Sequence, residues 1–458
     1  MPTFAADKMA TWTGGCWTRL PGGAVSGFTQ DTRSLTPGQV FVALKTDKRD
    51  GADFLAVAEA QGASAAIVSR AVPGSALPQL VGPDALAAFQ RIAREHRREF
   101  SGSIIGVTGS VGKTSTKDLL GVLLGGPPRV LTTAGNLNNH IGVPLTLTRL
   151  DSALHDFAAI EAGISAPGDM APLAEMIEPD HSIVTLVAPA HLEKLGTVEA
   201  VAREKALLPA ANRDGGLAVF PASCWQYAPF QSLTNAWVLV PEGEERPARA
   251  GRTLTFRVSQ SSAGTAITLG PKRIFNLRRV SPGMAQNTAL ALALASELGV
   301  TDAVLQTRLA DWQPSPWRGE VRTVGDAVVY CDFYNANPAS MADAVAAFNG
   351  SVSPELPRLY VLGGMEELGE DSATYHRLLG RQLQLRRGDF LYALGSQAAV
   401  LREGLLENGN AAAQVAVITD LAPVREQLAT FKGAVFLKGS RRYRLETVLD
   451  PMAVPAAH

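Results

Sequence analysis

Cysteine is scarce in this chain of 458 residues. The three cysteines, Cys16, Cys224 and Cys331, are odd in number and widely spaced, and no Cys-x-x-Cys pair occurs. This pattern excludes the disulfide framework of a small secreted protein. We therefore expect a reducing environment and a cytoplasmic location.

Charge of one sign and long apolar runs are also lacking. Lysine and arginine number 42 and aspartate and glutamate 43, a net charge of −1 with both signs interspersed. We therefore expect no nucleic-acid binding and no attachment to an anionic membrane surface. No segment approaches the roughly 20 apolar residues of a spanning helix, and the N-terminus lacks a basic region before an apolar core. We expect neither export nor membrane insertion, and a monomer is the simplest oligomeric state.

What is present indicates a large globular protein of about three domains, with 46% hydrophobic and 19% charged residues. Residues 1–98 alternate short apolar strands with helical patterns and predict a small α/β domain. Residues 99–312 interleave helices with continuous apolar strands, typical of a parallel sheet covered on both faces; period-two runs within 215–280 predict antiparallel strands at its edge. Residues 313–458 repeat strand and helix like a Rossmann sheet. The predicted fold class is α/β, with a central phosphate-loop ATPase domain between a small N-terminal domain and a Rossmann-like C-terminal domain.

The most informative segment is a buried strand that runs into a glycine-rich turn and then a helix. After the strand at 104–107 come the candidate nucleotide-binding residues Thr108-Gly109-Ser110-Val111-Gly112-Lys113-Thr114. The two glycines let backbone N–H groups surround an anion, Lys113 supplies a positive charge, and the Thr114 hydroxyl can ligate magnesium. The full phosphate-loop pattern has glycine at the position of Val107. A glycine-rich turn that binds no phosphate is therefore the alternative. The order of strand, loop and helix favours a nucleoside triphosphate.

Two polar residues follow apolar strands of the same predicted sheet. Glu161 ends the strand at 157–160, and His191 comes just after the strand at 182–187. Open α/β sheets bind ligands at the carboxyl ends of their strands, so Glu161 could reach a phosphate-bound magnesium ion and His191 could act as a ligand. A surface carboxylate and a solvated loop histidine are the alternatives.

A lysine lies on the apolar stripe of a predicted helix that starts after Thr197. Val198, Val201 and Lys205 share this stripe, so Lys205 points where the apolar residues point. A long lysine stem that lies along apolar surface is one interpretation. The other is a lysine of lowered pKa that captures carbon dioxide, because the resulting carbamate is an anion able to bind a hard cation.

Amides and one carboxylate mark two further loops. The segment from Gly135 to Pro144 contains Asn136, Asn138 and Asn139, whose amides suit a phosphate or an amide-bearing substrate, although turns use asparagine too. In the last domain, Asp332 lies at a strand end, where a carboxylate can hold ribose hydroxyls.

Together these residues resemble the Mur ligase family of cell-wall synthesis, over essentially the whole chain. The motifs that carry the resemblance are Asp31-Thr32-Arg33, Asp50-Gly51-Ala52-Asp53-Phe54, Gly135-Asn136-Leu137-Asn138-Asn139, Tyr334-Asn335-Ala336-Asn337-Pro338, Glu366-Glu367-Leu368-Gly369 with His376, and Leu437-Lys438-Gly439-Ser440-Arg441. The resemblance implies an ATP-dependent ligase that forms a peptide bond. Its signatures imply that D-alanyl-D-alanine is joined to UDP-N-acetylmuramoyl-tripeptide through an acyl phosphate, the last cytoplasmic step of peptidoglycan precursor synthesis.

The same resemblance implies the roles of the catalytic and metal-binding residues. Lys113 would neutralise the γ-phosphate, and His191 and Lys205 would complete the catalytic set. Thr114 and Glu161 would hold one Mg²⁺, while His191 and a carbamylated Lys205 would help hold a second.

Binding residues for ATP and the other substrates follow by resemblance as well. Asn287 would face the adenine, Arg318 the phosphates and Asp332 the ribose. Because these residues come from two domains, we expect domain closure. The substrate-binding residues would be Asp31, Thr32 and Arg33 for the uridine nucleotide, with Asn136, Asn138, Asn139, Tyr334, Asn335 and Asn337.

Some positions depart from the family pattern and leave alternatives open. Pro282-Gly283-Met284-Ala285 stands where relatives carry Gly-Arg-His-Asn, Gly364 replaces an acidic residue, and His140 stands where aspartate is common. The alternatives are another Mur or folylpolyglutamate-type ligase that adds a single amino acid, a non-catalytic nucleotide-binding switch, and an inactive scaffold. A switch would leave His191 and the inward Lys205 unexplained.

Overall fold

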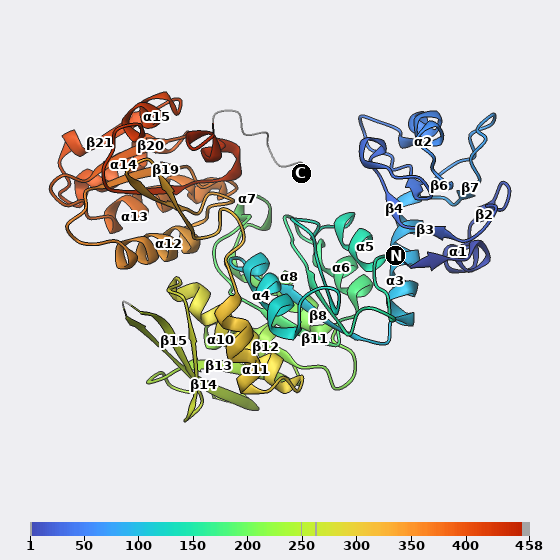
Figure 1. Cartoon of the computed structure of the whole chain (residues 1–458), viewed down its shortest axis with the longest axis horizontal. Helices are drawn as coiled ribbons and strands as arrows, with labels where there is room; N and C mark the ends of the chain where they lie inside the picture. Colours follow the sequence, from blue (N-terminus) through green and yellow to red (C-terminus); the bar gives the residue numbers. More distant parts are fainter. Residues whose placement is uncertain (1, 249, 262, 451–458) are drawn as a thin grey trace.

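Three main β-sheets follow one another along the chain, and helices pack on each of them (Figure 1). The structure, a computed structural model, describes residues 2–248, 250–261 and 263–450. The first and the last of the three parts stand on opposite sides of the central one (Figure 1). The predicted three-part α/β fold is confirmed, while the domain limits at 98 and 312 stay predictions. Within the described residues, no helix is both long and apolar enough to cross a membrane.

The first part has a five-stranded sheet of order β2-β7-β6-β5-β4, in which β4 to β7 run parallel and β2 is antiparallel at the edge. β1 and β3 form a separate antiparallel pair. The strands are β1 Thr3–Phe4, β2 Cys16–Trp17, β3 Val25–Ser26, β4 Phe28–Thr29, β5 Val40–Val42, β6 Ala65–Val68 and β7 Gln79–Val81. The helices are α1 Ala6–Thr13, α2 Leu55–Ala60 and α3 Ala85–Glu99. Asp84 begins α3 because its carboxylate accepts the N–H groups of Leu86 and Ala87.

The central part has nine strands in the order β16-β15-β14-β13-β12-β11-β8-β10-β9. Neighbours from β9 to β14 run parallel, and β14, β15 and β16 pair antiparallel, as predicted for the sheet edge. The strands are β8 Ser103–Thr108, β9 Val130–Thr132, β10 Phe157–Glu161, β11 His181–Val184, β12 Ala218–Pro221, β13 Ala236–Pro241, β14 Arg252–Ser261, β15 Gly264–Leu269 and β16 Arg273–Leu277. The helices are α4 Lys113–Leu124, α5 Gly142–Leu147, α6 Met170–Ile177, α7 Leu192–Leu195, α8 Val198–Ala210, α9 Ala228–Gln231, α10 Pro282–Glu297 and α11 Asp302–Asp311.

The last part has six strands in the order β17-β18-β22-β19-β20-β21, all parallel except β17. The last strand in sequence, β22, lies between β18 and β19, so the carboxyl ends of these three strands meet beside the central part. The strands are β17 Glu320–Val324, β18 Ala327–Cys331, β19 Arg358–Gly363, β20 Phe390–Leu394, β21 Val415–Ile418 and β22 Ala434–Lys438. The helices are α12 Pro338–Ser351, α13 Ser372–Gln382, α14 Ala398–Glu407 and α15 Ala422–Leu428.

Candidate active site

The glycine-rich turn joins β8 to α4 through two glycines that leave no room for a side chain. Gly109 and Gly112 have φ angles of 150° and 81°, in the region that favours glycine. A Cβ at Gly109 would lie 1.8 Å from Oγ1 of Thr185, and one at Gly112 would lie 2.1 Å from Nδ2 of Asn287. Asn287 therefore lies directly against the turn. Because α4 begins at Lys113, the free N–H groups of its first turn point at the space in front of the loop.

Two lysines, the half-buried Lys113 and the buried Lys205, donate to the same carbonyl of the turn. Nζ of Lys113 and Nζ of Lys205 each lie 2.9 Å from the Gly109 carbonyl oxygen. Burial lowers the pKa of Lys113, and burial together with the Lys113 charge holds the pKa of Lys205 well below its ordinary value. Lys205 is 1% exposed, which confirms the inward direction predicted from the helical stripe. The stripe could not reveal that the two ammonium groups share one acceptor.

Glu161 is a buried carboxylate at the end of β10 and not a surface residue, since it is 1% exposed. Its Oε2 accepts from the Thr114 hydroxyl at 2.8 Å, and its Oε1 accepts from Nδ2 of Asn138 at 2.7 Å. Asn138 thus orients the carboxylate, while Oδ1 of Asn139 accepts two backbone N–H groups and shapes its own loop. A hydroxyl and a carboxylate side by side are the oxygen donors that Mg²⁺ prefers.

His191 lies at the end of the loop after β11 and contacts the last part of the chain. Its backbone has a φ of 54°, and its Nδ1 lies 2.5 Å from Oε2 of Glu367. The hydrogen bond from His191 lowers the pKa of Glu367. Because Nδ1 is engaged, Nε2 is the ring nitrogen available to a ligand.

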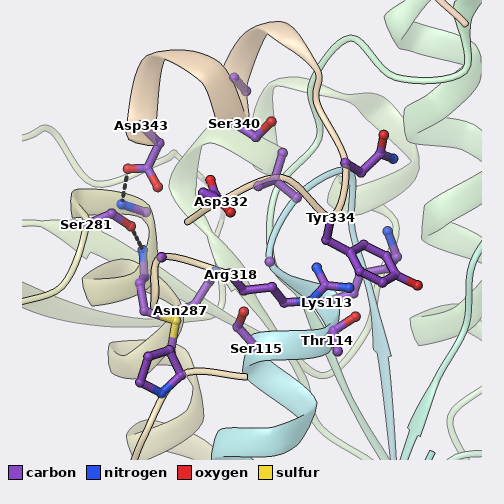
Figure 2. Close-up of a pocket in the computed structure, with 18 of the residues that line it drawn as sticks. Lys113, Thr114, Ser115, Ser281, Asn287, Arg318, Asp332, Tyr334, Ser340 and Asp343 are labelled. Carbon is purple, nitrogen blue, oxygen red and sulfur yellow. Dashed lines mark hydrogen bonds between the residues drawn. The ribbon is translucent and has the colours of Figure 1, made fainter. Parts of the chain in front are cut away.

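A cavity of about 690 Å³ lies between the central and last parts of the chain. Figure 2 shows Lys113 and Thr114 on one side of it and Asp332 and Tyr334 on another. The lining includes most of the predicted site residues, namely Ser110, Val111, Gly112, Lys113, Thr114, Asn136, Asn138, Asn139, Glu161, His191, Asn287, Arg318, Asp332, Tyr334, Asn335 and Asn337.

The wall contributed by the last part is held by two cationic side chains. The guanidinium of Arg318 lies 3.9 Å from the centre of the Tyr334 ring. Asp332 accepts from Nζ of Lys438 at 2.7 Å, and Lys438 is 1% exposed. At the start of α12, Nδ2 of Asn337 donates to the carbonyl of Ser110 at 3.4 Å, which links this wall to the glycine-rich turn.

Some predicted residues lie elsewhere. Thr108, Gly109 and Lys205 lie beneath the lining; the Thr108 hydroxyl donates to the Ala162 carbonyl at 2.9 Å. Asp31, Thr32 and Arg33 form a turn in the first part of the chain, where Asp31 accepts the backbone N–H of Arg33. In this arrangement the structure therefore does not bring the predicted uridine-nucleotide residues to the cavity.

Sequence reasoning gave no site role to Lys438 and did not single out Asp343, which lines the same cavity. A lysine that ends the apolar run of β22 was a usable signal for Lys438. A single aspartate within α12 gave no signal for Asp343, because such residues usually face solvent.

Comparison with known proteins identifies the family of this chain. The chain matches the Mur ligase middle domain over residues 107–295 and the Mur ligase glutamate ligase domain over residues 317–441. The UDP-N-acetylmuramoyl-tripeptide–D-alanyl-D-alanine ligase of Escherichia coli (strain K12) is 33% identical to it, over 92% of each chain. The chain belongs to the Mur ligase family.

Solved structures of family members have the same fold as this Mur ligase. MurF from Acinetobacter baumannii matches 99% of both chains with a TM-score of 0.87 and 25% identity. MurF ligase from Thermotoga maritima in complex with ADP matches 93% of this chain and 96% of its own with a TM-score of 0.79 and 27% identity. A bifunctional folylpolyglutamate synthase/dihydrofolate synthase, at 19% identity and a TM-score of 0.56, shares the fold alone.

Proposed function

We propose that this Mur ligase joins D-alanyl-D-alanine to the terminal carboxylate of UDP-N-acetylmuramoyl-tripeptide at the expense of ATP. The observation that carries the proposal is the similarity along almost the whole chain to ligases of that name, from Escherichia coli at 33% identity and Bacillus subtilis (strain 168) at 29%. The folylpolyglutamate-type ligase resembles it in fold alone. A nucleotide switch would not need a third domain that closes the cavity.

ATP would occupy the cavity, in keeping with the ADP bound in the relative from Thermotoga maritima. The turn from Thr108 to Thr114 would surround the phosphates, with Asn287 at the adenine, Arg318 at the phosphates and Asp332 at the ribose. Lys113 would leave the Gly109 carbonyl for the γ-phosphate, a stronger acceptor for an ammonium group than a neutral carbonyl.

The reaction would proceed in two displacements. A carboxylate oxygen of the tripeptide attacks the γ-phosphorus, the bond from phosphorus to the bridging oxygen breaks, and ADP leaves. The amine of D-alanyl-D-alanine then attacks the acyl carbon, phosphate leaves with the bonding electron pair, and the nitrogen loses a proton. The contribution of the protein is to hold reacting anions together and to neutralise their charge.

Magnesium fits the donors at the cavity. Thr114 and Glu161 offer adjacent oxygen atoms and His191 offers Nε2, so these residues would hold the ions, which neutralise phosphate charge when bound. Among the described residues, no three His, Cys, Asp or Glu side chains gather into a metal cluster. That is compatible with Mg²⁺, which commonly takes one or two protein carboxylates and completes its shell with phosphates and water.

Lys205 would carry a carbamate. Its lowered pKa keeps more of its amine neutral than an ordinary lysine does, and a neutral amine is the form that adds to carbon dioxide. The resulting anion would lie next to Lys113, so that an attraction would replace the repulsion between two cations.

The other substrates would bind beyond the phosphates. Asp31, Thr32 and Arg33 would hold the uridine nucleotide on the first domain, away from the cavity, and the amide loop with Tyr334, Asn335 and Asn337 would hold the peptide parts. The protein would act as a monomer in the cytoplasm, where these nucleotide-linked substrates are found.

The deciding experiment measures phosphate release from ATP and magnesium with UDP-N-acetylmuramoyl-tripeptide, with and without D-alanyl-D-alanine. We expect release only when both partners are present, and a product heavier by one dipeptide. Release with a single amino acid would point to another ligase, and release without an acceptor to a nucleotide switch.

Lys205→Ala tests the carbamate. We expect turnover to fall at least about a thousandfold, and short carboxylates added to the solution to restore part of it by replacing the missing anion. Lys194→Ala, which removes an exposed lysine of α7, is the matched control. Unchanged turnover in Lys205→Ala would rule out the assignment.

A further inference from the structure

A carboxylate of the last domain, Asp343 on α12, reaches across the cavity to the start of α10 in the central domain. Its Oδ1 accepts the N–H of Gly283 at 2.7 Å, and the Ser281 side chain also hydrogen-bonds to it. Figure 2 shows Asp343 directed at the Ser281 turn, and Asp332 and Asn287 line the same cavity. Burial raises the pKa of Asp343, and the bonds from Ser281 and Gly283 oppose that rise. The proposed catalysis gives this half-buried group no role.

The start of α10 matters because this helix forms the nucleoside side of the cavity. Ser281 caps α10 by accepting the N–H of Met284, and Gly283 lies in the first turn. About one turn later, Asn287 lies against Gly112 of the phosphate turn. A shift of the first turn of α10 would therefore move Asn287 as well.

Asp343 and Gly283 are matched in shape. A Cβ on Gly283 would lie 2.8 Å from Oδ2 of Asp343, closer than real Cβ atoms come. The carboxyl group thus fills the space that any side chain at position 283 would need. Residues 282–285, which depart from the family pattern, therefore include a glycine whose lack of a side chain makes room for Asp343.

Helix α12 is tied to the central domain at two places. Asn337 at its start donates to the Ser110 carbonyl of the phosphate turn, and Asp343, six residues later, holds α10. Six residues of α-helix span about 9 Å, so the two ties lie at separate places along the cavity wall. One helix of the last domain therefore holds both the phosphate turn and the nucleoside wall.

We propose that Asp343 is a positioning residue that fastens the last domain to the nucleoside wall, so that the nucleotide site is complete only while α12 is docked. The inference rests on the proposed function for the identity of the nucleotide. It does not require that ligation occurs.

Two measurements on the full chain test it without turnover. The first is the affinity for ADP with magnesium by calorimetry, and the second is the radius of gyration without nucleotide by X-ray scattering. We expect Asp343→Ala to bind ADP about tenfold more weakly, equivalent to about 1.4 kcal/mol, and to have a larger radius. Asp343→Asn keeps an oxygen acceptor for Gly283, so its affinity should stay within about threefold of the wild type.

The shape match supplies a second, independent arm. Gly283→Ala should displace the carboxyl group and weaken ADP about as much as Asp343→Ala does. The double variant should be no weaker than Asp343→Ala alone, because the new methyl group then has room; such non-additivity marks a direct contact. Asp311→Ala, which removes an exposed carboxylate at the end of α11, is the control.

The outcomes separate this inference from the proposed function. An unchanged affinity and radius in Asp343→Ala, or additive losses in the double variant, would overturn the positioning role. If these effects occur but D-alanyl-D-alanine is not ligated, only the proposed function fails. If the wild-type chain binds no ADP, the proposed ATP site fails and the scattering comparison decides the inference.

Discussion

The two outer domains are attached to the central domain in different ways. The first domain shares a buried core with it, because Ala93 of α3 belongs to the same apolar cluster as Leu150 and Ile177, and Leu145 packs against the core of the first domain. The last domain builds its two apolar clusters from residues after 316, with Tyr375 packed also against the central core. Its described polar ties to the central domain come from a few residues around the cavity, Asn337, Asp343 and Glu367 among them.

This difference indicates that the interface between the first and central domains is permanent, whereas the interface between the central and last domains can open. Disrupting a packed apolar interface lowers the stability by several kcal/mol, whereas each hydrogen bond contributes a net of about 1 kcal/mol. The first domain should therefore move little relative to the central domain, and the last domain should move readily. The predicted site residues that line the cavity lie at the joint that can open, which is where closure can assemble groups from two domains.

The largest expected effect is at the first joint. Arg97 is fully buried and donates to the carbonyls of Ile177 and Glu178 and to Asp180 at 2.8 Å. Arg97→Ala leaves these acceptors unpaired, so it should lower the free energy of unfolding by roughly 3 kcal/mol, measured by urea denaturation. Arg98→Ala, which removes a half-exposed partner of the Glu178 side chain, should lower it by less than about 1 kcal/mol. Equal effects of the two variants would contradict the rigid joint.

The second prediction concerns Lys205, which lies beneath the cavity. Here the expected change in the free energy of unfolding has the opposite sign. In buffer freed of carbon dioxide, Lys205 carries no carbamate, and Lys205→Met then removes a buried group whose charged form is repelled by Lys113. The free energy of unfolding should therefore rise by about 2 kcal/mol at pH 7, while ligation is lost. Such a gain would mean that the central domain holds an unfavourable charge for the sake of function.

The pH dependence of that stability checks the cause. The unfolded chain keeps the Lys205 proton up to about pH 10.5, whereas the folded protein releases it at lower pH because the pKa is lowered. Folding therefore releases a proton from Lys205 in this window, so the contribution of this residue to the stability of the wild type should rise with pH up to about 10.5. Lys205→Met should lack part of this rise, and Lys113 should still contribute its own. An unchanged pH profile in Lys205→Met would contradict the explanation.

A smaller effect is expected where the last domain meets His191. Glu367→Gln keeps an oxygen acceptor for Nδ1 but loses the charge that favours one orientation of the ring, so kcat should fall about tenfold with little change in the KM for ATP. The comparison is Glu193→Gln, an exposed carboxylate on α7. A change confined to KM would place Glu367 in nucleotide binding instead.

The sequence was sufficient for local features and insufficient for contacts across the joints. Glycine spacing, apolar runs and the stripe that carries Lys205 predicted the turn between β8 and α4, the parallel strands and the inward lysine, because each depends on neighbouring residues. The contact between His191 and Glu367 joins residues 176 positions apart. Likewise, the bond between Gly283 and Asp343 depends on how two helices of different domains dock. No local pattern encodes such pairs, so they needed the structure.

The smallest effect tests the linker between the central and last domains. The hydroxyl of Ser315 donates to Asp118 of α4, the helix that begins at the phosphate turn. Arg318, three residues further on, lines the cavity. Ser315→Ala should therefore lower kcat/KM for ATP about fivefold, equivalent to about 1 kcal/mol for one hydrogen bond, and leave stability nearly unchanged. Thr323→Ala, on the exposed edge strand β17, should leave both unchanged. If Ser315→Ala lowered stability as much as Arg97→Ala does, the linker would be part of a rigid joint, and the contrast between the two outer domains would not hold.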